Sequence, residues 1–69
     1  MGDPRLGSRL KAVRTAAGLT QADLADRAGV SRKTINTVEN GVFVPSTLLA
    51  LALARALDTT VEGLFYLTD

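Results

Sequence analysis

Residues 21–40 read Gln-Ala-Asp-Leu-Ala-Asp-Arg-Ala-Gly-Val-Ser-Arg-Lys-Thr-Ile-Asn-Thr-Val-Glu-Asn. This stretch decides the fold, because a glycine separates two segments with helical apolar spacing. Gly29 can adopt the positive φ that a tight turn between helices requires. Ala25 is small enough for two helices to cross closely at that turn, and Ser31 is a favoured N-cap for the helix that follows. The stretch therefore predicts two short helices joined by a tight turn, a helix-turn-helix.

Capping residues and apolar spacing elsewhere predict three further helices. Apolar residues recur every three or four positions from Leu6 to Ala17, which is typical of an amphipathic helix. Thr20 followed by Asp23 forms an acidic variant of the capping box. β-branched and aromatic residues, which strands prefer, are scarce. We therefore expect an all-α, compact five-helix single domain over residues 1–69, with helices at 8–17, 21–28, 32–40, 47–57 and 61–66.

The composition argues against several classes of function. The chain has no Cys and no His, which removes disulfides, thiolate nucleophiles and the usual zinc ligands. No Gly-rich phosphate loop and no recognisable catalytic pair of carboxylates is present, so we expect no enzyme, no catalytic residue, no metal and no cofactor. The N-terminal residues lack the apolar core of a secretion signal, and the longest apolar run, 48–54, is far shorter than a membrane span. We therefore expect a cytoplasmic protein without a membrane partner.

The net charge of +1 conceals an uneven distribution of charge along the chain. Residues 1–35 carry seven lysines and arginines against three aspartates, a net charge of +4. Residues 36–69 carry one arginine against four carboxylates, a net charge of −3. The basic half is a candidate surface for a polyanion, although charge alone would equally fit two differently solvated faces.

The helix expected over 32–40 has two different faces. Ile35 and Val38 are three residues apart and should share the buried face. The opposite face then carries groups that can form hydrogen bonds. An α-helix fits the major groove of DNA, where polar groups near its N-terminal end can reach base edges. We predict that this face reads DNA bases through Arg32, Lys33, Asn36 and Thr37.

A longer pattern extends on both sides of the predicted helix-turn-helix. It consists of Gly18-Leu19-Thr20-Gln21, Leu24-Ala25, Gly29-Val30-Ser31, Ile35, Val38-Glu39-Asn40-Gly41 and Pro45-Ser46. In these residues the chain resembles the phage repressor and Cro-like (XRE) helix-turn-helix family, over about residues 6–65. The resemblance implies a repressor-like DNA-binding domain and a transcriptional regulator that binds double-stranded DNA.

The resemblance also implies which residues contact the DNA backbone. Gln21 would contact a phosphate and brace the start of the third helix. The family often has glutamine at or just before the position of Lys33, so Arg32-Lys33 departs from the family pattern and suggests a more electrostatic or guanine-directed contact. The expected backbone contacts are Gln21, Ser31, Thr34 and Asn40, with Arg9 and Lys11 as additional candidates.

Arg14 and Glu39 lie on faces that also carry apolar anchors. The family pairs these two positions in a partly buried salt bridge between the first and third helices. We therefore expect Arg14 to be a structural ion-pair partner of Glu39, in preference to a DNA contact.

The helix expected over 47–57 is apolar on all sides, which is unusual for a surface helix of a monomer. Leu49, Leu53 and Leu57 should face the core, which leaves Leu48 and Leu51 on the outer face. Either the C-terminal residues fold back over this outer face, or it binds a partner. We favour a homodimer, with an interface formed by Leu48, Leu51, Phe43, Val44, Phe65, Tyr66 and Leu67.

Three functions are compatible with these patterns. The favoured one is a repressor that binds a palindromic operator as a homodimer, since steric exclusion needs no further surface. An antitoxin with a toxin partner, or the controller of a restriction-modification system, would use the same DNA-binding chemistry. The third is a protein-interaction module that has lost DNA binding, which the basic third helix disfavours.

Overall fold

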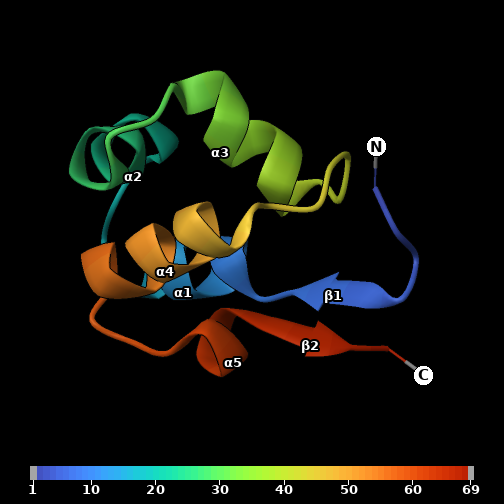
Figure 1. Ribbon diagram of the computed structural model, residues 1–69. Helices are drawn as coiled ribbons and strands as arrows, with labels where there is room; N and C mark the ends of the chain where they lie inside the picture. The colour runs from blue at the N-terminus through green and yellow to red at the C-terminus, as the bar shows by residue number, and fades with distance from the viewer. Residues whose placement is uncertain (1, 69) are drawn as a thin grey trace.

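Five helices and two short strands make up the computed structural model, which describes residues 2–68 (Figure 1). The helices α2 and α3 lie on one side of α1 and α4, α5 and β2 lie on the other side, and β1 extends beside α1 (Figure 1). The elements are β1 (Leu6–Ser8), α1 (Leu10–Ala16), α2 (Gln21–Ala28), α3 (Arg32–Glu39), α4 (Thr47–Ala56), α5 (Val61–Leu64) and β2 (Phe65–Leu67).

The turn chemistry that the sequence predicts around α2 and α3 is present. The Thr20 hydroxyl accepts a hydrogen bond from the Asp23 amide at 3.0 Å, and the Asp23 carboxylate accepts one from the Thr20 amide at 2.9 Å. These bonds lower the pKa of Asp23, because they favour its charged form. Gly29 ends α2 with a φ of +73°, and the Ser31 hydroxyl caps α3 by accepting from the Thr34 amide.

The core lies where α2, α3, α4 and α5 meet α1. Its fully buried large side chains come one from each of the five helices, namely Leu10, Leu24, Ile35, Leu53 and Leu64. Ala25 is also buried, as expected for a small residue at the crossing of α2 and α3. The inner face of α4 is confirmed as a core face, since Ala50 and Ala54 are buried beside Leu53.

The sheet was not expected from the sequence. β1 and β2 are antiparallel, with Leu6 opposite Leu67, Gly7 opposite Tyr66 and Ser8 opposite Phe65. The predicted first helix therefore begins at Leu10 and not at residue 8, and the predicted last helix ends at Leu64 and not at residue 66.

Gly7 leaves room for the Tyr66 ring to lie across the strand pair. A Cβ at this position would lie 2.3 Å from the Tyr66 ring, so a larger residue would force the ring away. On the other face of β2, the Phe65 side chain is buried in the core. The strand conformation thus depends on contacts between the two ends of the chain, which local spacing does not reveal.

The outer face of α4 is exposed. Leu48 is 79% and Leu51 is 55% accessible to solvent, so the alternative in which the C-terminal residues cover them is wrong. Those residues pair with β1 instead. No helix among residues 2–68 is long and apolar enough to cross a membrane.

Two leucines of α4 provide a matched test of this core. Leu53→Ala should lower the free energy of unfolding by about 2–5 kcal/mol, because it removes fully buried methyl groups and leaves a cavity. Leu48→Ala, in the same helix, should change it by less than about 0.5 kcal/mol. Urea denaturation at low protein concentration measures both. Equal losses would show that the inner and outer faces of α4 are assigned incorrectly.

Candidate nucleic-acid interface

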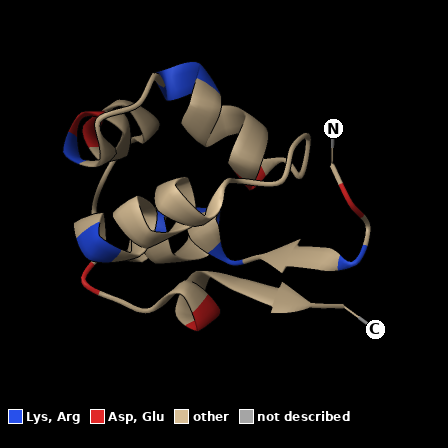
Figure 2. Ribbon diagram, in the orientation of Figure 1, with Lys and Arg blue, Asp and Glu red and all other residues tan. Residues whose placement is uncertain are grey.

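The helix α3 presents one polar face to solvent. Ile35 and Val38 are buried against the rest of the molecule, and this orients the opposite face outward. Arg32, Lys33 and Asn36 are exposed on that face, whereas Thr37 is only half-exposed. The basic residues at the start of α3 stand at one extremity of the molecule, on the side opposite the sheet (Figure 2).

Hydrogen bonds hold the two neutral side chains that we predict to read bases. The Asn36 carbonyl oxygen accepts from Asn40 Nδ2 at 3.2 Å, which orients the Asn36 amide. That oxygen has a second lone pair, and its NH2 group can still donate, so a bidentate contact with adenine stays possible. The Thr37 hydroxyl donates to the Thr34 carbonyl at 2.9 Å. Thr37 therefore offers chiefly its methyl group to a partner.

Three of the residues predicted to contact phosphates, Gln21, Ser31 and Thr34, lie at the starts of α2 and α3. The hydroxyls of Ser31 and Thr34 lie 2.9 Å apart at the beginning of α3. Gln21 begins α2, next to an open hollow of about 550 Å³ that Thr20 and Arg32 also line. A phosphate approaching this hollow would meet the amide groups at the start of α2 and a guanidinium group, both of which favour an anion.

The sequence led us to expect that Gln21 braces the start of α3, but the structure shows a different contact. Gln21 Nε2 donates instead to Glu39 Oε1, at the end of α3, at 3.1 Å. The Glu39 carboxylate accepts this hydrogen bond, which neither Arg32 nor Lys33 could do, because both side chains are donors only.

The ion pair between Arg14 and Glu39 is formed. Arg14 Nε lies 2.5 Å from Glu39 Oε2, and the two side chains are only 10% and 2% exposed. A second guanidinium nitrogen donates to Glu39 Oε1 at 3.1 Å, and a third donates to the Leu19 carbonyl at 2.9 Å. These bonds to Glu39 raise the pKa of Arg14. One carboxylate therefore joins α1, the start of α2 and the end of α3.

Two of these contacts were missed at the level of sequence. The Leu19 carbonyl accepts from Arg14, and the Gln21 amide donates to Glu39. Both contacts depend on how the turn between α1 and α2 lies in the folded chain. The hydrogen bond between Asn36 and Asn40 could have been predicted from the sequence, because residues four apart on a helix are neighbours.

The structure does not bring Arg9 to the exposed face of α3. Its guanidinium carbon lies 4.2 Å from the centre of the Tyr66 ring in β2, a cation–π contact on the sheet side of the molecule. Lys11 is exposed in the first turn of α1. Asn40 is exposed directly after α3, and Gly41 follows it with a φ of +69°.

The structure corrects part of the predicted dimer interface. Phe65 is only 8% exposed and belongs to the core, so its prediction as a surface residue is wrong. Phe43 is partly buried and packs against the core. The exposed apolar residues of the predicted set are Leu48, Leu51, Val44, Tyr66 and Leu67.

A short helix, a glycine turn and a second helix with a basic, hydrogen-bonding outer face define a helix-turn-helix of the DNA-binding class. The Helix-turn-helix family profile matches residues 10–64. An uncharacterized HTH-type transcriptional regulator of Methanothermobacter thermautotrophicus is 46% identical over 57 residues, 81% of this chain and 83% of the relative. The chain therefore belongs to the helix-turn-helix family.

Two solved structures are similar to the chain. The restriction-modification controller protein C.AhdI from Aeromonas hydrophila is 41% identical, with a TM-score of 0.76 over 78% of this chain and 82% of that chain. SinR, a master regulator for biofilm formation solved in complex with DNA, is 27% identical, with a TM-score of 0.74 over 78% of this chain and 87% of that chain.

The buried ion pair can be tested with a double-mutant cycle. Glu39→Leu leaves the Arg14 charge without its buried partner and should lower the free energy of unfolding by about 3–5 kcal/mol. Arg14→Met should be similarly costly, because it leaves Glu39 uncompensated. The double variant should lose clearly less than the sum of the two single losses. Additive losses in urea denaturation would show that the two charges do not depend on each other.

Proposed function

We infer that this chain is a DNA-binding transcriptional regulator that places α3 in the major groove of a specific operator. We also infer that it acts in the cytoplasm. The observation that carries this inference is the outer face of α3. Burial of Ile35 and Val38 fixes this helix, and Arg32 and Lys33 project from its exposed N-terminal turn. The similarity to SinR, which was solved with DNA, supports the same function.

Different residues would supply affinity and specificity. Arg32, Lys33 and Asn36 are proposed to read base edges, and Thr37 to contact them through its methyl group. Gln21, Ser31, Thr34 and Asn40 are proposed to position the protein on the phosphates, with Lys11 as a further candidate. Repression by occupancy is the simplest mode of action, because excluding another protein from an operator requires no additional surface.

Selection from a random duplex library tests both roles. Asn36→Ala should relax the preference at one base position, at a cost of about 1–3 kcal/mol on the preferred base. Gln21→Ala should weaken binding to all duplexes by a similar factor. If the chain enriches no sequence and shows no salt-dependent binding to duplex DNA, it is an interaction module and not a regulator.

The charge contribution can be measured separately. Arg32→Ala should lower the magnitude of the slope of log K against log salt by about 1, because its guanidinium group also lines the hollow assigned to a phosphate. Arg55→Ala removes the same charge from the end of α4 and should leave that slope unchanged. Equal effects of the two variants would indicate a general charge effect without a defined binding face.

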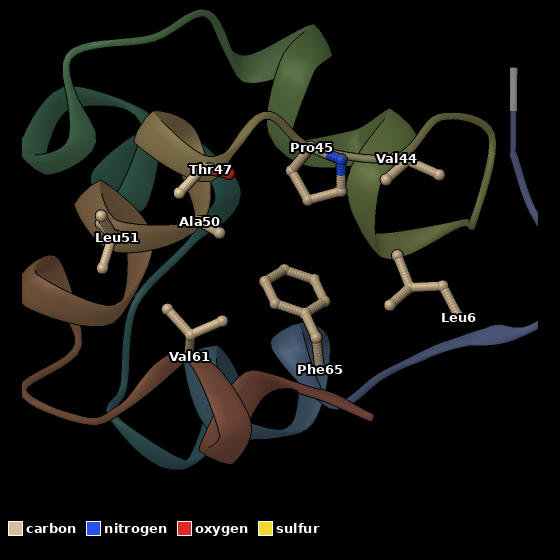
Figure 3. Close-up of a pocket in the computed structure, with 8 residues that line it drawn as sticks. All are labelled: Leu6, Val44, Pro45, Thr47, Ala50, Leu51, Val61 and Phe65. Atoms are coloured by element: carbon tan, nitrogen blue, oxygen red, sulfur yellow. The ribbon is translucent and has the colours of Figure 1, made fainter. Parts of the chain in front are cut away.

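We further propose that two copies of the chain associate through the exposed apolar surface. Leu51 borders an apolar pocket of about 240 Å³, which Val44, Pro45 and Val61 also line and in which the Phe65 ring is visible (Figure 3). A leucine side chain from a second copy fits the chemistry of this pocket, and its burial would remove exposed apolar area from water. A two-fold dimer would place paired α3 helices about 34–36 Å apart on a palindromic operator.

Leu51→Glu should shift the chain to a monomer, because it puts a charge at the edge of this pocket. Ala12→Glu, at an exposed position of α1, makes the same change outside the proposed interface and serves as the control. Sedimentation across a micromolar concentration range measures both. A wild-type chain that remains strictly monomeric would refute the dimer.

A restriction-modification controller is a second candidate, favoured by the 41% identity to C.AhdI. Both candidates use the same DNA-binding face and differ in the genes they control. The operator sequence recovered by selection can be located in the genome of the source organism. Genes for a DNA methyltransferase and an endonuclease beside it would distinguish this candidate from a general repressor.

A further inference from the structure

A second surface feature lies between α2 and α4, next to the proposed dimer pocket. It is an open groove of about 520 Å³ with an apolar floor of two leucines, Leu48 and Leu51, and three alanines. Arg27, in the last turn of α2, and Arg55, in the last turn of α4, also line it. Among residues 2–68, no acidic side chain lines the groove.

The two arginines are available to a partner. Within residues 2–68, neither guanidinium group takes part in a salt bridge. A cation in the last turn of a helix interacts favourably with the negative end of the helix dipole. This interaction leaves the side chain in solvent, and both arginines are exposed. Asp23, one turn before Arg27, is held by the Thr20 amide in the capping box.

The spacing of the exposed residues fits an α-helix. Leu48, Leu51, Ala52 and Arg55 occupy positions i, i+3, i+4 and i+7 along α4, and so form a single stripe of about two turns. The small side chain of Ala52 allows another helix to approach closely. An amphipathic helix docks in such a groove through apolar anchors at the same spacing.

The charge of the groove argues against the α4 helix of a second copy as its occupant. A partner's α4 would bring its own leucines and alanines, but the sequence of α4 contains no carboxylate. Both arginines would then be desolvated without compensation, which is unfavourable. A helix with carboxylates on both sides of an apolar stripe would satisfy the two guanidinium groups and the leucines together.

We propose that the groove between α2 and α4 is a docking site for an acidic amphipathic helix of another protein. This site is independent of the DNA-binding face of α3. Leu51 borders both the groove and the pocket proposed for dimerisation, so an acidic helix bound in the groove would compete with self-association. The site would thereby give a partner protein control over the number of copies on DNA.

A charge-swap experiment tests the proposal. The probes are two helical peptides of about 18 residues with the same leucine stripe, one flanked by glutamates and the other by lysines. Fluorescence anisotropy should show the glutamate peptide bound at least about tenfold more tightly than the lysine peptide, with affinity falling as salt rises. Arg27→Glu with Arg55→Glu should reverse this preference.

The control makes the same change of charge elsewhere. Arg5→Glu with Arg9→Glu should leave the glutamate peptide bound within about threefold of wild type, apart from the change in long-range attraction. Equal affinity for both peptides, no binding of either, or equal losses in the two double variants would overturn the proposal. A loss of self-association in Arg27→Glu/Arg55→Glu would overturn it too, because the occupant would then be a second copy. DNA binding, measured on the same variants, reports separately on the proposed function.

Discussion

The hydrogen bonds of the Glu39 carboxylate fix the end of α3 against α1 and the start of α2. One of its oxygens accepts from Arg14, and the other accepts from both Arg14 and Gln21. Arg14 in turn holds the Leu19 carbonyl. Because both charged side chains are almost completely buried, the attraction between them is offset by a large desolvation cost. What the arrangement provides is geometry, since it joins the end of α3 to α1 and to the start of α2.

This constraint connects the interior to the proposed DNA contacts. Gln21 begins α2 beside the hollow that we assign to a phosphate, and Glu39 ends the helix whose outer face would read bases. The proposed backbone clamp and the proposed reading face are therefore held relative to each other by one buried group. Such rigidity favours specific binding, because less conformational freedom is lost when the protein docks on DNA.

The apolar side chains of α4 are divided between the core and the surface. Its inner face fills the core through Leu53, while its outer face leaves Leu48 and Leu51 in solvent. Neither face contributes to the DNA-binding surface of α3. In a domain of this size, α3 can therefore be reserved for DNA while α4 is available for a second copy or for another protein, a separation on which both surface proposals rest.

The sequence by itself determined the helix-turn-helix, because its signals are local. Gly29 and Ser31 specify the turn and the cap through their own backbone and side-chain chemistry, and the spacing of Ile35 and Val38 selects the buried face of α3. Only the tertiary structure decided the rest. The pairing of Leu6 with Leu67 and the bond from Gln21 to Glu39 join residues that are distant along the chain, so no periodicity records them. Phe65 was misplaced for the same reason, since its burial depends on a strand that forms only once both ends of the chain meet.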